Sequence, residues 1–283
     1  MARIHATLGQ QVRTAPVVAL TIAATDSGGG AGLAADLRTF AALGVFGALV
    51  VTAVTAQNTF EVNDFTAIER DLVSAQLDAV LSDISVAAAK TGMLPSPEVV
   101  RSLASRWNSG LLPPLVVDPV LVTSTGAPLF PGVDLASCYR DLIAHATVTT
   151  PNTLEAALLT GHRVASVEDM ERAARELHAT GPRLVIVKGG RRPGPEAVDV
   201  AFDGRAVTLL RSSWIKTPNV HGSGCTFSAA IAANLALGLD PLEAAIAAKR
   251  FVSRAIQRGA RWKLGRGHGP LDQAGAARDE ADR

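Results

Sequence analysis

Residues 17–44 read VVALTIAATDSGGGAGLAADLRTFAALG, and this stretch decides the fold. It opens with a short apolar run, passes through a glycine-rich loop, and then places Leu33, Leu37 and Phe40 on one helical face, up to a stop at Gly44. A buried strand that passes through a tight loop into an amphipathic helix is the basic unit of a parallel α/β sheet. We therefore predict that this segment opens such a sheet.

The same alternation of apolar runs and helical patterns continues along the chain. Strands are predicted at VAAAKTG, LVVD, TVTTPN and LVIVKGG, and helices at ERDLVSAQLDAVLSD, SPEVVRSLASRWNSG and SVEDMERAARELHATG. ALVVTAVTA (48–56) is predicted as one further strand. AVDVAFDGRAVTLLR (197–211) is predicted as a hairpin that turns at Asp203-Gly204, either at an edge of the sheet or as a flap. The pattern indicates an α/β fold with a mostly parallel central sheet.

Composition argues against several classes of function. The 283 residues are 48% hydrophobic and carry a formal net charge of +1, which gives no bias toward nucleic acid or membrane surfaces. The two cysteines, Cys138 and Cys225, are too few for a disulfide framework, which favours a reducing cytoplasm. We expect a small molecule as the partner, one domain over residues 15–272, and flexible ends at 1–14 and 273–283.

In open parallel sheets ligands bind where the strands end, so the residues after each apolar run are candidates for a site. After the first strand, TDSGGGAG (25–32) permits close backbone approach to a ligand, and Asp36 lies one helical turn further on, near the mouth of that site. An ordinary strand-to-helix turn is an equally good interpretation. The loop is not a dinucleotide-binding fingerprint, because Leu33 stands where a third small residue is needed. It is not a P-loop either, because no Gly-Lys-Ser/Thr follows.

Three more strand ends carry charged side chains. Asp118 in VVDPV suits Mg²⁺, which keeps several waters and takes few protein ligands, or else forms an ordinary turn before proline. Glu155 in TPNTLEA is either a ligand of metal-bound water or an acid favoured at a helix N-terminus. Lys188 in VKGGR offers a cation to a phosphate beside two glycines. Each of these signals is weak when taken alone.

The segment VHGSGCTFSAAIAANLALG (220–238) places glycines and a cysteine at the start of an apolar helix. Free N–H groups of Gly222, Ser223 and Gly224 would attract anions and stabilise charge on a transferring phosphoryl group. The same helix end predicts a lowered thiol pKa for Cys225. The alternative is that Cys225 packs as a small apolar side chain, as most lone cysteines do.

The order of these loops resembles that of the hydroxymethylpyrimidine/phosphomethylpyrimidine kinases of thiamine biosynthesis, a branch of the ribokinase-like superfamily. The resemblance covers residues 17–270 and rests on LTIAATDSGGGAGLAADLRTFAALGVFG, TAVTAQNT, KTGMLPS, VVDPV, TPNTLEA, VKGG, HGSGCT and GRGHGP. It implies a three-layer αβα sandwich with a small β-hairpin or flap, ATP and Mg²⁺ as cofactors, and a homodimer. It also implies phosphorylation of 4-amino-5-hydroxymethyl-2-methylpyrimidine and then of the resulting monophosphate.

The resemblance also implies roles for individual residues at the substrate and metal sites. Gln57 in TAQNT would hydrogen-bond the aminopyrimidine edge, Met93 in KTGML would pack on the ring, and Asp36 would lie at the substrate site. Asp118 and Glu155 would serve Mg²⁺ and its waters.

At the nucleotide, the resemblance implies that Lys188 contacts the ATP phosphates. Lys249 would lie near the nucleotide, with a solvated helix residue as the alternative. Cys225 stands where related sugar kinases have an aspartate that accepts the hydroxyl proton. Either a thiolate is the base, or phosphoryl transfer depends mainly on positioning and on the amides from Gly222 to Gly224. We expect Cys225 and these amides to form the catalytic centre.

Three positions depart from the family pattern. Ala24 replaces a glycine and would narrow the substrate pocket, and Ser124 and Ala127 replace a lysine and an aspartate of the nucleotide loop. Two alternative functions stay open, namely a pyridoxine or pyridoxal kinase and a catalytically weak ligand-binding relative. Gln57 favours the aminopyrimidine, because a buried amide that pairs with a ring nitrogen and an amine rejects substrates that lack them.

Overall fold

The computed structural model describes residues 15–122, 134–190 and 194–281. The main sheet contains β1 (Val18–Ala23), β2 (Phe46–Val51), β5 (Ala88–Thr91), β6 (Leu115–Val117), β7 (Val148–Thr149), β8 (Leu184–Val187), β9 (Glu196–Phe202) and β10 (Val207–Ser213). A two-stranded sheet contains β3 (Ala53–Gln57) and β4 (Val62–Ala67). The helices are α1 (Gly32–Ala42), α2 (Arg70–Asp83), α3 (Pro97–Trp107), α4 (Leu135–Ala144), α5 (Thr153–Thr160), α6 (Val167–His178), α7 (Ser223–Ala236), α8 (Pro241–Gly259) and α9 (Gln273–Ala281). This alternation confirms the predicted α/β class.

The main sheet has the strand order β10-β9-β8-β7-β6-β5-β1-β2 within the described residues. Neighbouring strands are parallel except at β9, which is antiparallel to both β8 and β10. The chain leaves β1 for β2 on one side and later runs from β5 to β8 on the other. The carboxyl ends of β1 and β5 therefore flank a topological switch point, where open α/β sheets bind ligands.

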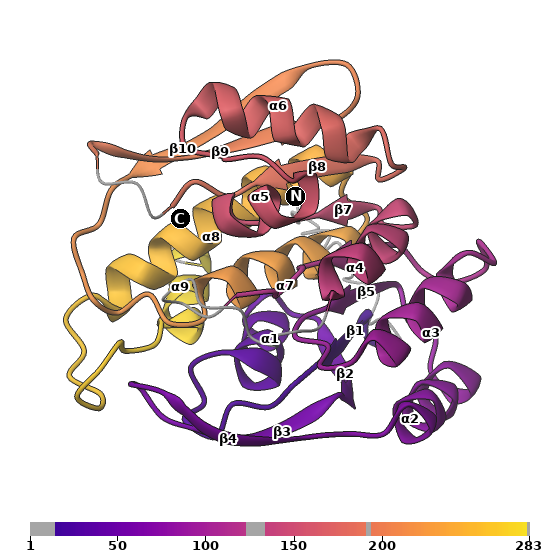
Figure 1. The fold of residues 1–283 in the computed structure, drawn as a ribbon. Coiled ribbons are helices and arrows are strands. Elements are labelled where there is room, and N and C mark those ends of the chain that lie inside the picture. Colours follow the sequence, from indigo (N-terminus) through magenta and orange to yellow (C-terminus); the bar gives the residue numbers. More distant parts are fainter. Residues whose placement is uncertain (1–14, 123–133, 191–193, 282–283) are drawn as a thin grey trace, which may run out of the picture.

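Helices cover both faces of the sheet (Figure 1). In β1, Leu20 and Ile22 belong to the core that includes side chains of α2, α3, α4 and α6, whereas Ala19 belongs to the core that includes α1, α7 and α8. A strand covered on both faces needs small or apolar side chains throughout, and all of β1 is buried. The predicted three-layer αβα arrangement is confirmed.

The predicted hairpin is formed by β9 and β10. At its turn, the Asp203 carboxylate accepts hydrogen bonds from the N–H groups of Arg205 and Ala206, both at 2.8 Å, and Gly204 has a φ of 87°. Glycine adopts this positive φ without strain. Because β9 also pairs with β8, the hairpin is an edge of the main sheet and not a flap.

The flap is formed instead by β3 and β4, which lie at one end of the molecule (Figure 1). The single strand predicted for residues 48–56 was wrong: the run divides at Thr52, and only β2 stays in the main sheet. The Thr52 hydroxyl donates to the Met93 carbonyl (2.7 Å), and its own carbonyl accepts from the Ile68 N–H (2.9 Å). The β-propensity is uniform along the run, so it gives no sign of this division. The division depends instead on the distant partners of Thr52.

The C-terminal end is ordered further than the flexible end predicted for residues 273–283. Residues Gln273–Ala281 form α9, which contacts α1 and α8. Leu271, Gln273 and Ala276 are almost fully buried, a fact that the polar composition of the last residues conceals. The predicted flexible end at 1–14 lies outside the described residues. No helix of the described ranges is both long and apolar enough to cross a membrane.

Candidate active site

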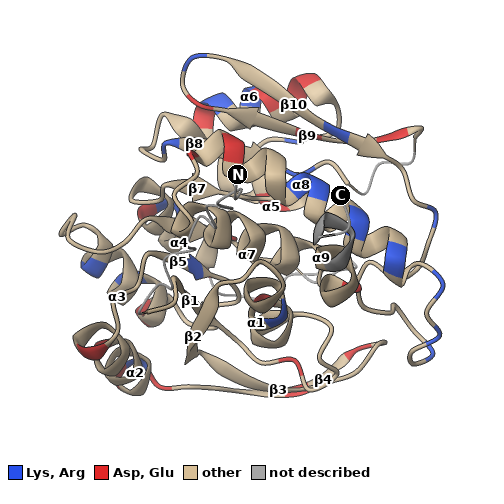
Figure 2. Ribbon diagram, turned by 180° about the vertical axis from the view of Figure 1, so that it is seen from behind, with Lys and Arg blue, Asp and Glu red and all other residues tan. Residues whose placement is uncertain are grey.

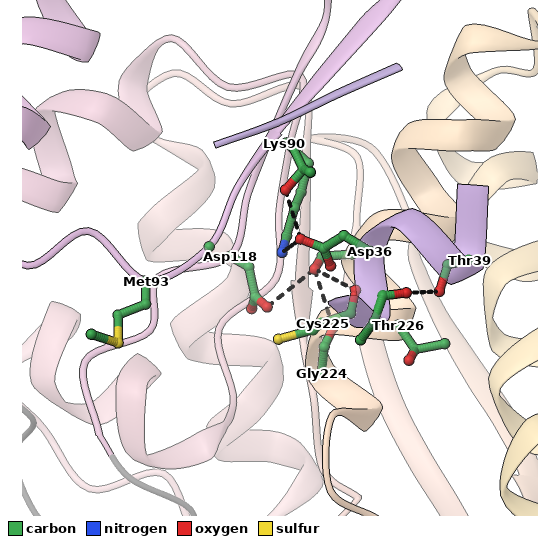
Figure 3. A network of polar contacts seen from close by, with 12 residues as sticks. Asp36, Thr39, Lys90, Met93, Asp118, Gly224, Cys225 and Thr226 are labelled. Carbon is green, nitrogen blue, oxygen red and sulfur yellow. Dashed lines mark hydrogen bonds and ion pairs between the residues drawn. The ribbon is translucent and has the colours of Figure 1, made fainter. Parts of the chain in front are cut away.

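The predicted site residues gather around the first turn of α7. Figure 3 shows Asp36 on α1, Lys90 on β5, Asp118 directly after β6 and Cys225 in that first turn. Lys188 follows β8 and contacts Asp118. The site therefore lies at the carboxyl ends of the central strands, as the fold predicts.

The glycine-rich loop after β1 is built around Asp26. Its carboxylate accepts hydrogen bonds from the N–H groups of Gly28 (2.8 Å), Gly30 (2.9 Å) and Ala31 (2.8 Å), and lies 3.0 Å from His221 Nε2. Burial raises the pKa of Asp26, but the hydrogen bonds from His221 and the backbone hold it below its usual value. Sequence analysis missed Asp26, although an acid two residues before a glycine run is a signal for a side chain that caps the loop.

Ala24 is only 3% exposed, so its methyl group has little direct access to a ligand. Its carbonyl accepts from the Leu33 N–H at 3.0 Å. Gly32 has a φ of 54°, and a side chain there would collide with the Ala24 carbonyl. The glycine thus lets α1 begin directly against the end of β1. Ser124 and Ala127, the other departures from the family pattern, lie outside the described residues.

Asp36 is sealed beneath the site rather than placed at its mouth, which corrects the sequence prediction. Its Oδ2 lies 2.7 Å from Lys90 Nζ and accepts from Thr21 Oγ1 at 2.6 Å. Both side chains of the ion pair are fully buried. Burial raises the pKa of Asp36 against the attraction of Lys90. The partner was not evident from sequence because Lys90 belongs to a distant strand that reads as an apolar run.

The first turn of α7 is an uncapped helix N-terminus. Gly222 has a φ of 82°, and no side chain caps the helix among the residues that the structure describes. A side chain at Gly222 would collide with the Gly30 carbonyl, so this glycine allows the helix to approach the loop after β1. Gly222, Ser223, Gly224 and Cys225 are all partly exposed. The Ser223 N–H donates to the Val220 carbonyl at 3.1 Å, whereas the N–H groups of Gly222 and Gly224 have no acceptor among the described residues, so two of the three predicted amides are free.

The Cys225 thiol does not have the lowered pKa predicted from the helix end. Burial raises its pKa to about 11; Lys90 partly offsets this increase, while Asp36 and Asp118 add to it. The thiol is therefore protonated at neutral pH. The prediction was wrong because the sequence reveals the helix end but neither the burial of the thiol nor the two carboxylates near it.

Asp118 and Lys188 form a second ion pair. Lys188 Nζ lies 2.7 Å from Asp118 Oδ1, which also accepts from Thr150 Oγ1 at 3.1 Å, and Ser228 Oγ donates to Oδ2 at 3.1 Å. Burial raises the pKa of Asp118, but Lys188 and Lys90 hold it below its ordinary value. The Lys188 side chain is 16% exposed, so this pair borders the open site. An ordinary turn before proline does not account for these contacts.

Glu155 fits both interpretations given to it from the sequence. Its Oε2 accepts from the Asn152 N–H at 2.8 Å in a capping box at the start of α5. Burial raises its pKa to about 7, with Lys188 opposing the shift and Asp118 adding to it. Asp118 and Glu155 offer the oxygen ligands that Mg²⁺ prefers. The described residues contain no group of three His, Cys, Asp or Glu side chains able to hold a metal, so water and phosphate oxygens would complete the coordination.

Lys249 is not the solvated helix residue of the alternative interpretation. It is 8% exposed and its Nζ lies 2.7 Å from Asp199 Oδ2, while Asp199 Oδ1 accepts from the Gly189 N–H at 2.9 Å. This relay of two contacts, from Lys249 to Asp199 and from Asp199 to the Gly189 N–H, supports the loop directly after Lys188. A neighbouring cavity of about 310 Å³ is lined by Arg211, Ser212, Lys249, Arg250, Ser253 and Arg254. Figure 2 shows the basic residues along α8.

Gln57 ends β3 and contacts the site from the flap. Its backbone N–H donates to Ser27 Oγ (2.8 Å), the Ser27 hydroxyl donates to the Gln57 carbonyl (2.7 Å), and its side-chain amide lies 3.3 Å from His221 Nε2. Met93 follows β5 and is partly exposed; its carbonyl holds Thr52 at the base of the flap. Sequence analysis missed the contact between His221 and Gln57.

Comparison with known proteins assigns the family. The model of the phosphomethylpyrimidine kinase family matches residues 26–272. The chain belongs to this family. The hydroxymethylpyrimidine/phosphomethylpyrimidine kinases of Rhizobium meliloti and Synechococcus elongatus are 46% and 48% identical to it, and each alignment covers 90% of this chain and 96% of the relative. The resemblance drawn from the strand-end loops is confirmed.

Solved kinase structures share the fold. Bacillus subtilis pyridoxal kinase, determined as an ADP complex, has a TM-score of 0.85 and 38% identity over 92% of this chain and 98% of its own. A phosphomethylpyrimidine kinase from Clostridium difficile has a TM-score of 0.75 and 37% identity over 84% of this chain and 99% of its own. The fold is thus common to a pyridoxal kinase and a phosphomethylpyrimidine kinase.

Proposed function

We propose that this protein phosphorylates 4-amino-5-hydroxymethyl-2-methylpyrimidine and then the monophosphate, each time from ATP, in thiamine biosynthesis. The observation that carries the proposal is the uncapped start of α7 beside the open Lys188–Asp118 pair. Phosphoryl transfer needs fixed hydrogen-bond donors, a cation and carboxylates for a metal, and Glu155 adds the second carboxylate. Retention of all these groups argues against a catalytically weak relative, and the family supplies the substrate class.

In each step an oxygen of the substrate attacks the γ-phosphorus of ATP, the bond to the β-phosphate oxygen breaks, and ADP leaves. The first step also releases the proton of the substrate hydroxyl. Lys188 binds a phosphate oxygen, and the amides from Gly222 to Gly224 stabilise charge in the transition state. Mg²⁺ held through Asp118 and Glu155 would neutralise phosphate charge. Because the Cys225 thiol is protonated at neutral pH, we assign the larger catalytic role to the amides.

We propose that ATP extends from Lys188 toward the basic cavity beside Lys249. β10 runs parallel to β8, so Arg211 near its end lies at the same edge of the sheet as Lys188. The relay from Lys249 through Asp199 to the Gly189 N–H connects the two places. Lys249 then supports the nucleotide loop from behind.

The substrate ring is proposed to bind between Gln57 on the flap and Met93 after β5. Gln57 hydrogen-bonds the aminopyrimidine edge, and Met93 packs on the ring. Asp36 cannot touch the substrate, because its side chain and that of Lys90 are sealed, so it acts on this site through its electric field and through the fold. Ala24 shapes the floor of the substrate pocket, because its carbonyl packs directly against Gly32.

We also propose that the protein is a cytoplasmic homodimer. Phe46 and Leu49 on β2, Val54 on β3 and Phe65 on β4 are between 37% and 55% exposed. Exposed apolar side chains on an edge strand and on the flap provide surface that an interface between subunits can cover. Sedimentation should show a dimer, and Val54→Glu should shift the protein toward monomer.

Pyridoxal kinase is the second candidate function, because structural neighbours of similar identity carry that name. The test is ATP consumption by purified protein with Mg²⁺ and, in parallel, the aminopyrimidine alcohol, its monophosphate and pyridoxal. Turnover of both pyrimidines with slow pyridoxal is the expected result. Turnover of pyridoxal alone would replace the proposal by the second candidate, and turnover of none would favour a binding relative.

A further inference from the structure

Asp26, Gln57 and His221 meet at a single atom, the Nε2 of His221. This nitrogen lies 3.0 Å from Asp26 Oδ2 and 3.3 Å from the Gln57 amide atom placed as Nε2. The residues come from the loop after β1, the end of β3 and the segment before α7. A ring nitrogen carries either a proton or a lone pair, so it cannot donate to one neighbour and accept from the other. Its protonation decides which end of the Gln57 amide faces it.

Asp26 determines that protonation. The backbone N–H groups of Gly28, Gly30 and Ala31 donate to its carboxylate, and with His221 they hold its pKa below the usual value despite burial. An ionised carboxylate accepts hydrogen bonds and donates none. His221 Nε2 must therefore carry a proton, whether the ring is neutral or charged.

Both partners of this contact are fixed in place. A side chain on Gly30 would collide with the His221 ring, so the ring packs directly over that glycine. The His221 backbone N–H donates to the Gly269 carbonyl at 3.1 Å. The backbone of Gln57 is held in both directions by Ser27 Oγ. The contact between His221 and Gln57 is therefore a built part of the site.

The proton on Nε2 already has Asp26 Oδ2 as its acceptor, and a Gln57 NH₂ group facing the same nitrogen would set one donor against another, so the amide oxygen is the end that can face His221. The oxygen and nitrogen of a glutamine amide are nearly indistinguishable by shape, so their assignment follows from hydrogen bonding. With the oxygen toward His221, the NH₂ group is turned away from the ring nitrogen. Apart from the contact with His221, the Gln57 side-chain amide makes no hydrogen bond within the described residues of the chain.

We propose that His221 is a specificity-determining residue, which donates from Nε2 to Asp26 and to the Gln57 oxygen and so keeps the Gln57 NH₂ group as a donor for the substrate. The inference rests on the proposed function of Gln57 at the pyrimidine site. The selected ligand class has an unprotonated ring nitrogen beside the exocyclic amine, as in a 4-aminopyrimidine. A pyrimidin-4-one is rejected, because its ring N–H meets a second donor.

The first test measures the protonation of His221 and needs no turnover. The protein is labelled with ¹⁵N-histidine, and the His221 signals are assigned by their loss in His221→Phe. The expected result is a proton on Nε2, read from the nitrogen shifts and their couplings to the ring protons. An unprotonated Nε2 would overturn the inference, whatever the enzyme turns over.

The second test compares kcat/KM for the aminopyrimidine alcohol and its 4-oxo analogue. Wild-type protein should prefer the amine by at least about 100-fold. His221→Phe keeps a ring over Gly30 but lacks the N–H, and should lower this preference to about tenfold or less. Gln57→Glu keeps an acceptor toward His221 but loses the NH₂ donor, and should lower kcat/KM for the amine about 100-fold, mainly through KM.

His162→Phe is the matched control, because His162 contacts Glu176 and no residue of the site. This variant should leave kcat/KM unchanged for both the aminopyrimidine alcohol and its 4-oxo analogue. An unchanged preference in His221→Phe would overturn the inference while the kinase assignment stands. Wild-type protein that turns over neither pyrimidine would refute the proposed function instead, and the NMR result would still decide the state of His221.

Discussion

Two lysine–aspartate pairs lie near the start of α7 and differ mainly in exposure. Each has a nitrogen-to-oxygen distance of 2.7 Å, but the side chains of Lys90 and Asp36 are 0% exposed, whereas those of Lys188 and Asp118 are 16% and 3% exposed. A sealed pair cannot touch a ligand and acts only through the fold and its electric field. An open pair can exchange one partner for a phosphate oxygen.

The two pairs also differ in how well their oxygens are satisfied. Thr150 and Ser228 donate to the two oxygens of Asp118. In contrast, Asp36 Oδ1 has no hydrogen-bond partner among the described residues. Desolvation of a buried pair often cancels its attraction, so the sealed pair need not stabilise the fold more than two uncharged side chains would.

Breaking the sealed pair should give the largest effect. Lys90→Met leaves Asp36 buried without a cation and should lower the free energy of unfolding by about 3–5 kcal/mol. Adding Asp36→Asn removes the uncompensated charge and should restore most of this loss. Urea unfolding of both variants measures the difference. A double variant as unstable as the single one would contradict our account of the sealed pair.

Breaking the open pair should affect catalysis more than stability. Lys188→Ala removes a cation that binds phosphate, and kcat/KM for ATP should fall by about 10²–10³-fold. Solvent reaches the remaining carboxylate, so the melting temperature should change less than in Lys90→Met. Steady-state kinetics with varied ATP test this, with the exposed Lys263→Ala as control. Normal ATP kinetics in Lys188→Ala would remove Lys188 from the nucleotide site.

The same contrast explains which features were accessible from the sequence. Lys188 and Asp118 follow apolar runs directly, so a strand-end rule finds both. Lys90 stands inside the run VAAAKTG and resembles a chance polar residue, and its partner Asp36 was predicted at the mouth of the site, with no sign of its burial. A pair sealed between two distant segments leaves no local pattern.

Other differences also arise from contacts between distant segments. The division of β2 from β3 depends on Thr52 reaching Met93, and the burial of Gln273 depends on its contact with Thr226 (3.1 Å). The pKa of Cys225 depends on Lys90, Asp36 and Asp118 together. Periodicity and composition report on one segment at a time, which is why the helix end was predicted and the state of its thiol was not.

Glu155 is a third buried carboxylate to set beside Asp36 and Asp118, and it shares Lys188 with Asp118. Its pKa is raised by burial from 4.5 to about 7, so the folded state keeps a proton that the unfolded chain loses between these pH values. This group therefore makes the free energy of unfolding fall as pH rises through that window. Glu155→Gln cannot ionise and should gain about 2 kcal/mol relative to wild type between pH 5 and 8.

Urea unfolding of wild type and Glu155→Gln at several pH values measures this gain. The exposed Glu61→Gln provides the control for losing a carboxylate elsewhere, and its difference from wild type should not change with pH in the same way. A constant difference between Glu155→Gln and wild type would show that Lys188 compensates the Glu155 charge fully.

Cys225 is influenced by both pairs, and its replacement should have the smallest effect. If the amides of the α7 start supply most of the catalysis, Cys225→Ala should lower kcat only about tenfold, with KM for the pyrimidine little changed. Cys138→Ala removes the other free cysteine and serves as the control. A thiolate base with a pKa of about 11 would instead make wild-type kcat/KM rise tenfold per pH unit between pH 7 and 9. That slope in wild type, together with its loss in Cys225→Ala and a loss of activity above about 10³-fold, would transfer the main catalytic role from the backbone amides to the thiol.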